Sequence, residues 1–243
     1  MAVILLTYKK YPKSSGGVAK HAEHLKRSFP QAKHFCWEDF PDHRAYDSIS
    51  EPPKAKKLTH WLAERGHIVK SDLVIADGFW FADLKKIGCT IFSVIHGTFA
   101  GWIGQNHPLS QAQKDIIPNA DRWIAVSPFA QYEAKKYYGI NAEIILNGVD
   151  LSIFKPDPAI KKTFDFVDMA TNTDKGSGLT SVLKKHFKGY SINGRGHKEI
   201  PHLLNQARVF VSPSRYEGNS YAILEAIACG LSIVSSPTGL FWT

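Results

Sequence analysis

The chain has 243 residues, of which 44% are hydrophobic, and its formal net charge is +8. This composition excludes an intrinsically disordered chain, and the length allows one large hydrophobic core or two smaller ones. The positive charge favours an anionic ligand such as a nucleotide, a phospholipid surface or nucleic acid, but the basic residues are spread along the chain and single out none of these.

Localisation is indicated by the N-terminus and the cysteines. The apolar run AVILL at residues 2–6 is too short for the hydrophobic region of a signal peptide, and no later run approaches the length of a membrane span. Cys36, Cys89 and Cys229 are odd in number and far apart, which predicts buried free thiols in a reducing compartment. We therefore expect a soluble, cytoplasmic protein without a transmembrane segment.

Short apolar segments alternate with helical patterns from the N-terminus onward. The run at residues 2–7 is followed by the turn KKYPKSSGG and then by the helical pattern VAKHAEHLKRSF. Further elements are predicted as strands at residues 73–76, 90–95 and 123–126, and as a helix at 129–138. The alternation predicts a parallel sheet covered by helices on both faces, which is an α/β domain.

The segment ILNGVDLSIFKPDPAIKKTF, residues 145–164, interrupts this alternation. Pro156 and Pro158 break its periodicity, so we expect a linker that divides residues 1–155 from residues 156–243. The alternation then restarts with strands at 164–170, near Tyr190, at 209–212 and at 231–235, and with helices at 179–187, 200–207 and 219–229. We predict two Rossmann-like domains facing a cleft, with ligands beyond the carboxyl ends of the strands.

Glu225 stands in an otherwise apolar helical pattern. Its neighbours three and four residues away are Tyr221, Ala222, Ala228 and Cys229. A buried carboxylate without a partner is strongly unfavourable, so this side chain needs a partner. The alternatives are a salt bridge to an arginine elsewhere in the core, a solvent-facing edge, or a functional role in binding a ligand.

Glu217 has a structural alternative of its own, because Ser214 and Glu217 have the spacing of a helix capping box. The residues that follow, Gly218 and Asn219, are small, and the backbone N–H groups and positive dipole of a helix entrance suit a phosphate. From Asn219 to Glu225 a helix rises about 9 Å. This length suits a nucleoside diphosphate, with the phosphate at the helix entrance and the ribose at Glu225.

The two glutamates, with seven residues between them and followed by AIACGLSIVSSPTG, resemble the E-x7-E signature of the retaining GT-B glycosyltransferases of family 4. Other segments resemble the same family in the same order along the chain. GGVAKHAEHL resembles the family's glycine-rich loop and helix, and HGTF resembles its strand-end histidine. VSPFAQYEAKKYYG and ILNGVDLSIF resemble the segments that lead into its interdomain linker, and TDKG resembles its phosphate-contacting lysine and glycine. These matches cover nearly the whole chain.

The resemblance implies a GT-B fold whose second domain holds a nucleotide-sugar donor. Glu225 would bond the ribose hydroxyls, Glu217 would contact the donor sugar, and Lys175 would neutralise the diphosphate. Backbone amides for the sugar or phosphate would come from the small residues Gly218, Asn219 and Ser220.

The first domain would also contribute. Gly16 and Gly17 would close over the diphosphate, since a residue without Cβ allows close backbone approach, and His96 would lie near the reacting sugar. The alternatives are a plain turn for the two glycines and a satisfied strand-end histidine for His96. His21 and His24, one helical turn apart, are interpreted as surface residues rather than ligands.

The implied activity is transfer of a hexose from a UDP- or GDP-sugar to a hydroxyl, with retention of configuration, without a metal ion and without a cofactor. The chain contains no Asp-x-Asp and no Cys-x-x-Cys, so no metal site is predicted. Catalysis would depend on stabilising the charge that develops on phosphate, with Glu217, His96 and Lys175 as the catalytic residues.

Two departures from the family pattern concern the donor site. The segment DMATNTDKG has no arginine between Asp168 and Lys175, where the family has a Gly-Arg pair, and Arg195 and Arg215 are the candidate substitutes. The C-terminal domain is also abbreviated, which affects recognition of the base.

The acceptor stays open between a saccharide, a lipid head group and modified DNA. Aromatic and basic residues are interleaved in LTYKKYPK, FCWEDFPDHR, HWLAERGH and GFWFADLKK. Such segments can bind a sugar, a lipid head group or a flipped base, or they can be ordinary core aromatics with solvated lysines. The alternative functions are therefore a transferase that glycosylates DNA and a non-catalytic nucleotide- or carbohydrate-binding protein of the same fold.

Overall fold

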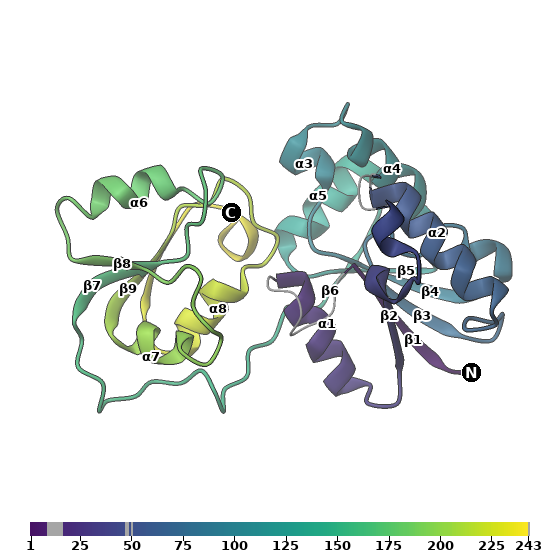
Figure 1. The fold of residues 1–243 in the computed structure, drawn as a ribbon. Coiled ribbons are helices and arrows are strands. Elements are labelled where there is room, and N and C mark those ends of the chain that lie inside the picture. The colour runs from purple at the N-terminus through teal and green to yellow at the C-terminus, as the bar shows by residue number, and fades with distance from the viewer. Residues whose placement is uncertain (9–16, 47–48, 50, 243) are drawn as a thin grey trace. The chain divides into compact units, whose positions relative to one another are not determined.

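The structure is a computed structural model that describes residues 1–8, 17–46, 49 and 51–242. The chain divides into two compact units, Met1–Leu146 (unit 1) and Asn147–Thr243 (unit 2). Each unit is built on one sheet (Figure 1), and all strand pairs of both sheets are parallel. The division lies inside the segment 145–164, N-terminal to the linker position expected from the prolines.

Unit 1 contains a six-stranded sheet in the order β2-β1-β3-β4-β5-β6. The strands are Val3–Thr7 (β1), Lys33–Cys36 (β2), Leu73–Asp77 (β3), Thr90–Ile95 (β4), Arg122–Ala125 (β5) and Glu143–Ile144 (β6). The helices are Gly17–Ser28 (α1), Glu51–Glu64 (α2), Phe99–Ile103 (α3), Pro108–Ile116 (α4) and Pro128–Tyr138 (α5). Short 3-10 turns occur at Trp37–Asp39, His43–Tyr46, Leu84–Ile87 and Ile117–Asn119. Figure 1 shows α1 on one side of this sheet and α2 and α4 on the other.

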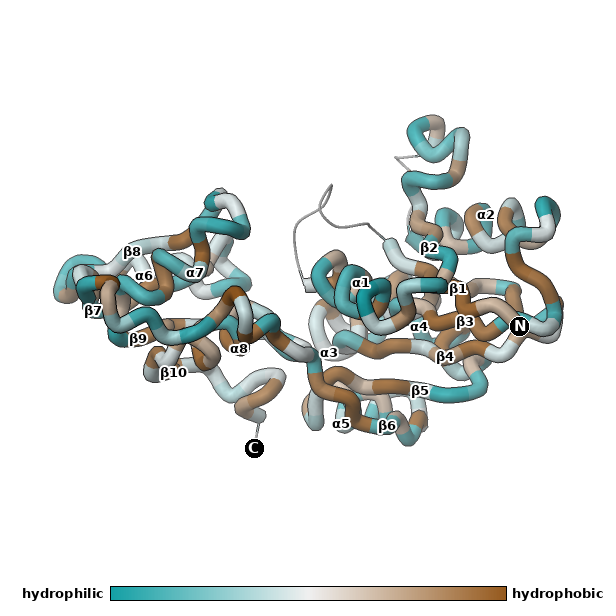
Figure 2. Tube along the Cα trace, turned by 90° about the horizontal axis from the view of Figure 1, so that it is seen from below, coloured by the Kyte–Doolittle hydropathy of each residue, from teal (hydrophilic) through white to brown (hydrophobic). Residues whose placement is uncertain are grey.

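The core of unit 1 forms because its central strands are apolar on both faces. Ile4, Leu5 and Leu6 are consecutive on β1 and fully buried, as expected for a parallel strand that helices cover on both sides. Figure 2 shows apolar residues along β4 and mostly hydrophilic residues along α1. Among the described residues no helix combines the length and the apolar character needed to cross a membrane.

The segment after β4 is fixed by a buried carboxylate. The Thr98 hydroxyl caps α3 by accepting a hydrogen bond from the Gly101 N–H. Glu133 on α5 is buried and accepts hydrogen bonds from the Thr98 N–H at 3.2 Å and from its hydroxyl at 3.1 Å. The chain that follows His96 is thereby held at the carboxyl edge of the sheet.

Unit 2 contains a four-stranded sheet in the order β10-β9-β7-β8. The strands are Phe164–Asp168 (β7), Gly189–Ser191 (β8), Ala207–Ser212 (β9) and Ser232–Ser235 (β10), and the helices are Ser177–Leu183 (α6), Ile200–Asn205 (α7) and Tyr221–Ala228 (α8), with a final 3-10 turn at Gly239–Phe241. Figure 1 shows α6 on one side of this sheet and α7 and α8 on the other. That arrangement follows from right-handed crossovers, because the chain moves one way from β7 to β8 and the opposite way from β8 to β9.

Cys36, Cys89 and Cys229 all lie within the described residues and are buried and free, which confirms the prediction of buried thiols. Burial raises the pKa of the Cys229 thiol to about 11, so the thiol stays protonated at neutral pH.

Gly189 on β8 lies opposite Phe166 on β7, and the phenyl ring covers it. A Cβ at Gly189 would lie 2.2 Å from the ring Cζ. We expect Gly189→Ala to lower the free energy of unfolding of unit 2 by about 2 kcal/mol, because a core ring must move. Urea unfolding of the full chain measures this change.

Gly178→Ala on α6 is the control, because a Cβ there meets no atom within 4 Å. It should leave stability unchanged or raise it slightly, since alanine favours a helix more than glycine does. Phe166→Leu should recover part of the loss in the Gly189→Ala background. An unchanged urea midpoint for Gly189→Ala would contradict this description of the packing.

Candidate functional site

The site in unit 2 lies where the strand order changes direction. Strand β7 has β8 on one side and β9 on the other, and the loops after β7 and β9, residues 169–176 and 213–220, leave the same edge of the sheet. In open parallel sheets this switch point is where ligands bind. The Arg215 N–H donates a hydrogen bond to the Asp174 carbonyl at 2.8 Å and joins the two loops directly.

Glycine residues allow the loops of this site to approach one another closely. Gly176 has φ of 79°, and a Cβ there would lie 2.6 Å from the carbonyl oxygen of Pro213. Gly239, in the turn after β10, has φ of 58°, and its Cβ would lie 2.9 Å from the Gly218 carbonyl oxygen. Both positions combine a left-handed backbone with backbone neighbours too near for any side chain. Three loops therefore meet main chain to main chain.

Lys175 and Glu217 face each other across these loops. The Lys175 Nζ lies 2.6 Å from Glu217 Oε1 and donates a hydrogen bond to it. The capping-box alternative for Glu217 is wrong, because α8 begins only at Tyr221 with Ser220 as its N-cap. The polypeptide between Ser214 and Ser220 is a loop, and this loop directs Glu217 toward the lysine.

Asn147, the asparagine of NGVD, was not predicted to belong to the site. It is buried, and its Nδ2 donates a hydrogen bond to the carbonyl oxygen of Asn219 at 3.2 Å. Asn219 is itself buried just before the N-cap of α8. Asn147 therefore holds the backbone at the entrance of the helix. The resemblance of its segment to a known family is the signal that could have identified it.

Glu225 is 2% exposed on α8, and the ring of His197 lies beside it. The distance from His197 Nε2 to Glu225 Oε1 is 3.6 Å. His197 comes from the loop after β8, and its ring packs edge-on against Phe154 at 5.4 Å between centroids. A histidine therefore accompanies this buried carboxylate. Sequence reasoning missed His197, because nothing in NGRGH distinguishes it from a surface loop.

The two candidate substitute arginines differ in surroundings. The Arg195 guanidinium donates a hydrogen bond to the Tyr190 hydroxyl at 2.6 Å and lies 5.9 Å from the centre of its ring. The Arg215 side chain is exposed. Gly17, the first residue of α1, and His96 belong to unit 1, and Gly16 lies outside the described residues.

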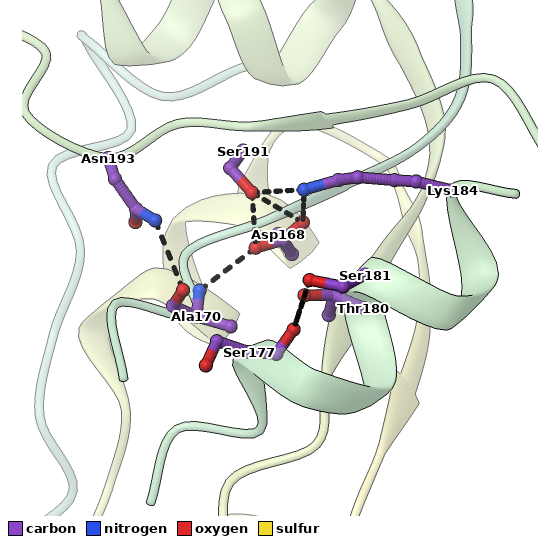
Figure 3. Close-up of polar contacts among 8 residues, drawn as sticks. All are labelled: Asp168, Ala170, Ser177, Thr180, Ser181, Lys184, Ser191 and Asn193. Atoms are coloured by element: carbon purple, nitrogen blue, oxygen red, sulfur yellow. Dashed lines mark hydrogen bonds and ion pairs between the residues drawn. The ribbon is translucent and has the colours of Figure 1, made fainter. Parts of the chain in front are cut away.

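A buried ionic network supports the loop that carries Lys175 (Figure 3). Asp168, at the end of β7, is fully buried and accepts hydrogen bonds from the Ser191 hydroxyl at 2.9 Å and from the Ala170 N–H at 3.0 Å. Lys184 Nζ lies 3.1 Å from its Oδ2 and also hydrogen-bonds Ser191. A buried carboxylate with these donors fixes the start of loop 169–176. Lys184 is a cation at this edge that the sequence did not reveal.

Unit 1 has its own polar cluster at the carboxyl ends of β3 and β4. Asp77 Oδ1 lies 3.1 Å from His96 Nε2 and 3.3 Å from His21 Nδ1. Burial opposes ionisation of Asp77, but the contacts and charge of both histidines outweigh burial and lower the pKa of Asp77. The interpretation of His21 as a surface residue is wrong, because α1 turns this side chain toward the sheet, where it is 13% exposed.

Two family models cover almost the entire chain. Residues 15–153 match the model described as Glycosyltransferase Family 4, and residues 148–241 match Glycosyl transferases group 1. The chain belongs to glycosyltransferase family 4.

Several solved structures share the fold of this chain. Sucrose-phosphate synthase from Thermosynechococcus elongatus superimposes with a TM-score of 0.72 at 16% identity, over 98% of this chain and 82% of that chain. Anabaena HepE in complex with UDP-glucose gives 0.70 at 15% identity, over 98% and 81%. Trehalose-6-phosphate synthase OtsA gives 0.72 at 10% identity, over 98% and 85%. Among curated protein sequences, none matches this family 4 chain.

The predicted fold class and family resemblance are thus confirmed. The family 4 chain is an α/β glycosyltransferase of the GT-B type, with a six-stranded sheet and a four-stranded sheet.

Removing the Lys184 charge should destabilise unit 2 of this glycosyltransferase. We expect Lys184→Met to lower the free energy of unfolding by on the order of 2 kcal/mol, because it leaves the buried Asp168 carboxylate without its cation. Hydrogen exchange at α6 and β8 should become faster. Lys185→Met is the matched control at the next, exposed position and should change neither quantity. Equal protection in both variants would contradict a structural role for Lys184.

Proposed function

We propose that this glycosyltransferase transfers a hexose from a UDP- or GDP-sugar to a hydroxyl acceptor, with retention of configuration and without a metal ion at the donor phosphates. The observation that carries the proposal is the pairing of Lys175 with Glu217 at the switch point of the unit 2 sheet, beside a helix that buries Glu225. A cation and two carboxylates at the carboxyl edge of a parallel sheet suit a phosphate, a sugar and a ribose.

Lys175 is suited to receive the diphosphate. Its side chain is 39% exposed, so the ammonium group is accessible to a phosphate and can exchange Glu217 for it. The Glu217 side chain is only 15% exposed and needs new partners when the lysine leaves. Glu217 then accepts hydrogen bonds from the sugar hydroxyls. In the substrate-free protein the ion pair keeps both side chains near their working positions, which lowers the entropic cost of binding.

Stabilisation of the departing diphosphate is the main catalytic requirement. Negative charge grows on the phosphate as the bond to the sugar breaks, and the Lys175 ammonium and the backbone N–H groups at the start of α8 lie on the same edge to receive it. We propose that the acceptor attacks from the face that the diphosphate leaves and passes its proton to a phosphate oxygen. His96 and Gly17 of unit 1 are further contributions that the family resemblance implies, together with Gly16, which lies outside the described residues.

The nucleotide part of the proposal has support from related structures. The HepE complexes contain UDP, UDP with glucose, and UDP-glucose, and an Arabidopsis starch synthase IV catalytic domain of the same fold binds ADP and acarbose. UDP therefore comes first in a thermal-shift panel of nucleoside diphosphates and their sugar conjugates, followed by ADP and by GDP, because a bound ligand raises the melting temperature by mass action.

Glu225→Gln tests the ribose contact. We expect the affinity for UDP, or for the preferred nucleoside diphosphate, to fall about tenfold, because a hydrogen bond to a charged group contributes about 1.5–3 kcal/mol. The wild type should bind the 2′,3′-dideoxy nucleotide about as weakly as Glu225→Gln binds the normal nucleotide. The variant should bind the dideoxy nucleotide with nearly the same affinity as the wild type does, because the ribose hydroxyls that Glu225 would contact are absent. Calorimetric titration measures all four affinities.

Glu143→Gln, on the exposed strand β6, is the control for loss of one negative charge and should bind UDP as the wild type does. Parallel losses for both nucleotides in Glu225→Gln would show that Glu225 acts elsewhere than at the ribose.

Glu217→Ala separates binding from transfer. We expect release of nucleoside diphosphate from the sugar donor to fall at least a hundredfold, while the affinity for the nucleotide stays within a few-fold, because the carboxylate faces the sugar rather than the base. A coupled assay of diphosphate release, with water or a saccharide as acceptor, gives the rate. A wild-type protein that binds nucleotide and never releases diphosphate would establish a binding protein of the same fold.

A further inference from the structure

We propose that His21, Asp77 and His96 form a binding site for a borderline divalent metal ion, of which Zn²⁺ is the first candidate. The three residues come from α1, the end of β3 and the end of β4, and their ligand atoms all lie within 4.8 Å of one another. The site belongs to unit 1 and shares only His96 with the residues that the family resemblance implies for transfer.

The distances from the carboxylate oxygen match those of a metal site. In a tetrahedral zinc site with ligands about 2.0–2.1 Å from the metal, neighbouring ligand atoms are about 3.3 Å apart. Asp77 Oδ1 lies 3.1 Å from His96 Nε2, to which it is hydrogen-bonded, and 3.3 Å from His21 Nδ1. Both distances from this oxygen are therefore those that a shared ion would impose, and the ion would replace the hydrogen bond to His96.

Two of these side chains have buried atoms without hydrogen-bond partners among the described residues. These atoms are His21 Nδ1 and Asp77 Oδ2. A buried carboxylate oxygen and a buried imidazole nitrogen without such bonds are unfavourable. A cation bound between them would satisfy both atoms, since two neutral imidazoles and one carboxylate are a common ligand set.

The environment also suits a bound ion. The Asp77 side chain is 4% exposed, whereas the side chains of His21 and His96 are 13% and 22% exposed. The carboxylate thus supplies charge from the buried side, and the rings leave a path from solvent and room for a water or another ligand. The edge-on contact of the two rings, 4.6 Å between centroids, keeps both near the carboxylate.

Metal titration of the untagged full-length chain, after treatment with a chelator, tests the proposal. We expect one equivalent of Zn²⁺ per chain by equilibrium dialysis, and Co²⁺ should give the intense visible absorption of a four- or five-coordinate site. His21→Ala should weaken Zn²⁺ binding at least tenfold, and Asp77→Asn and His96→Ala should do the same, because each removes one ligand. His60→Ala is the control, since His60 is 73% exposed on α2.

Zn²⁺ should also raise the melting temperature of the wild type and of His60→Ala, but not that of His21→Ala. His21→Ala keeps the test valid if Asp77→Asn fails to fold. Circular dichroism identifies variants that are folded. Absence of one tight equivalent in the wild type, or equal binding by the wild type and a folded His21→Ala variant, would overturn the proposal. Nucleotide binding by unit 2 is read separately, so either proposal can fail alone.

Discussion

Each sheet is parallel throughout, so the carboxyl ends of all its strands lie along one edge. The charged and titratable side chains of both candidate sites lie at this edge of their sheets. In unit 2 the ion pair of Lys175 and Glu217 spans the loops after β7 and β9. In unit 1 Asp77 is the last residue of β3, and its carboxylate contacts His96, the residue that follows β4. The rest of each unit serves to hold these loops: Asp168 and Lys184 brace the first loop, and Asn147 fixes the entrance of α8.

The strands of both cores were predictable because buried parallel strands are continuous apolar runs. The predictions at residues 2–7, 90–95 and 231–235 agree with β1, β4 and β10 to within one residue. Strand β2, with the sequence KHFC, and the two-residue β6 carry too few apolar residues to produce such a run. The helix α2 was not predicted because two prolines and three lysines obscure its apolar face.

The candidate site was predictable only in part. Lys175 and Glu217 were identified from local motifs, and the structure brings them together although 42 residues separate them. His197, Lys184 and the partnership of His21 with Asp77 were not predictable, because each depends on a contact between distant segments. No local periodicity records such contacts, and only the topology of the sheet brings the side chains to a common edge.

The glycines of the three loops in unit 2 have a consequence for adaptability. Gly176 and Gly239 let backbone atoms of neighbouring loops lie directly against one another, so no side-chain rotation at these contacts can absorb a change of ligand shape. Under the proposed function, a change of sugar preference would therefore come from the other side chains of loops 169–176 and 213–220. In directed evolution of this chain, libraries that vary those positions should yield altered selectivity, whereas diversity at the two glycines should yield mostly inactive proteins.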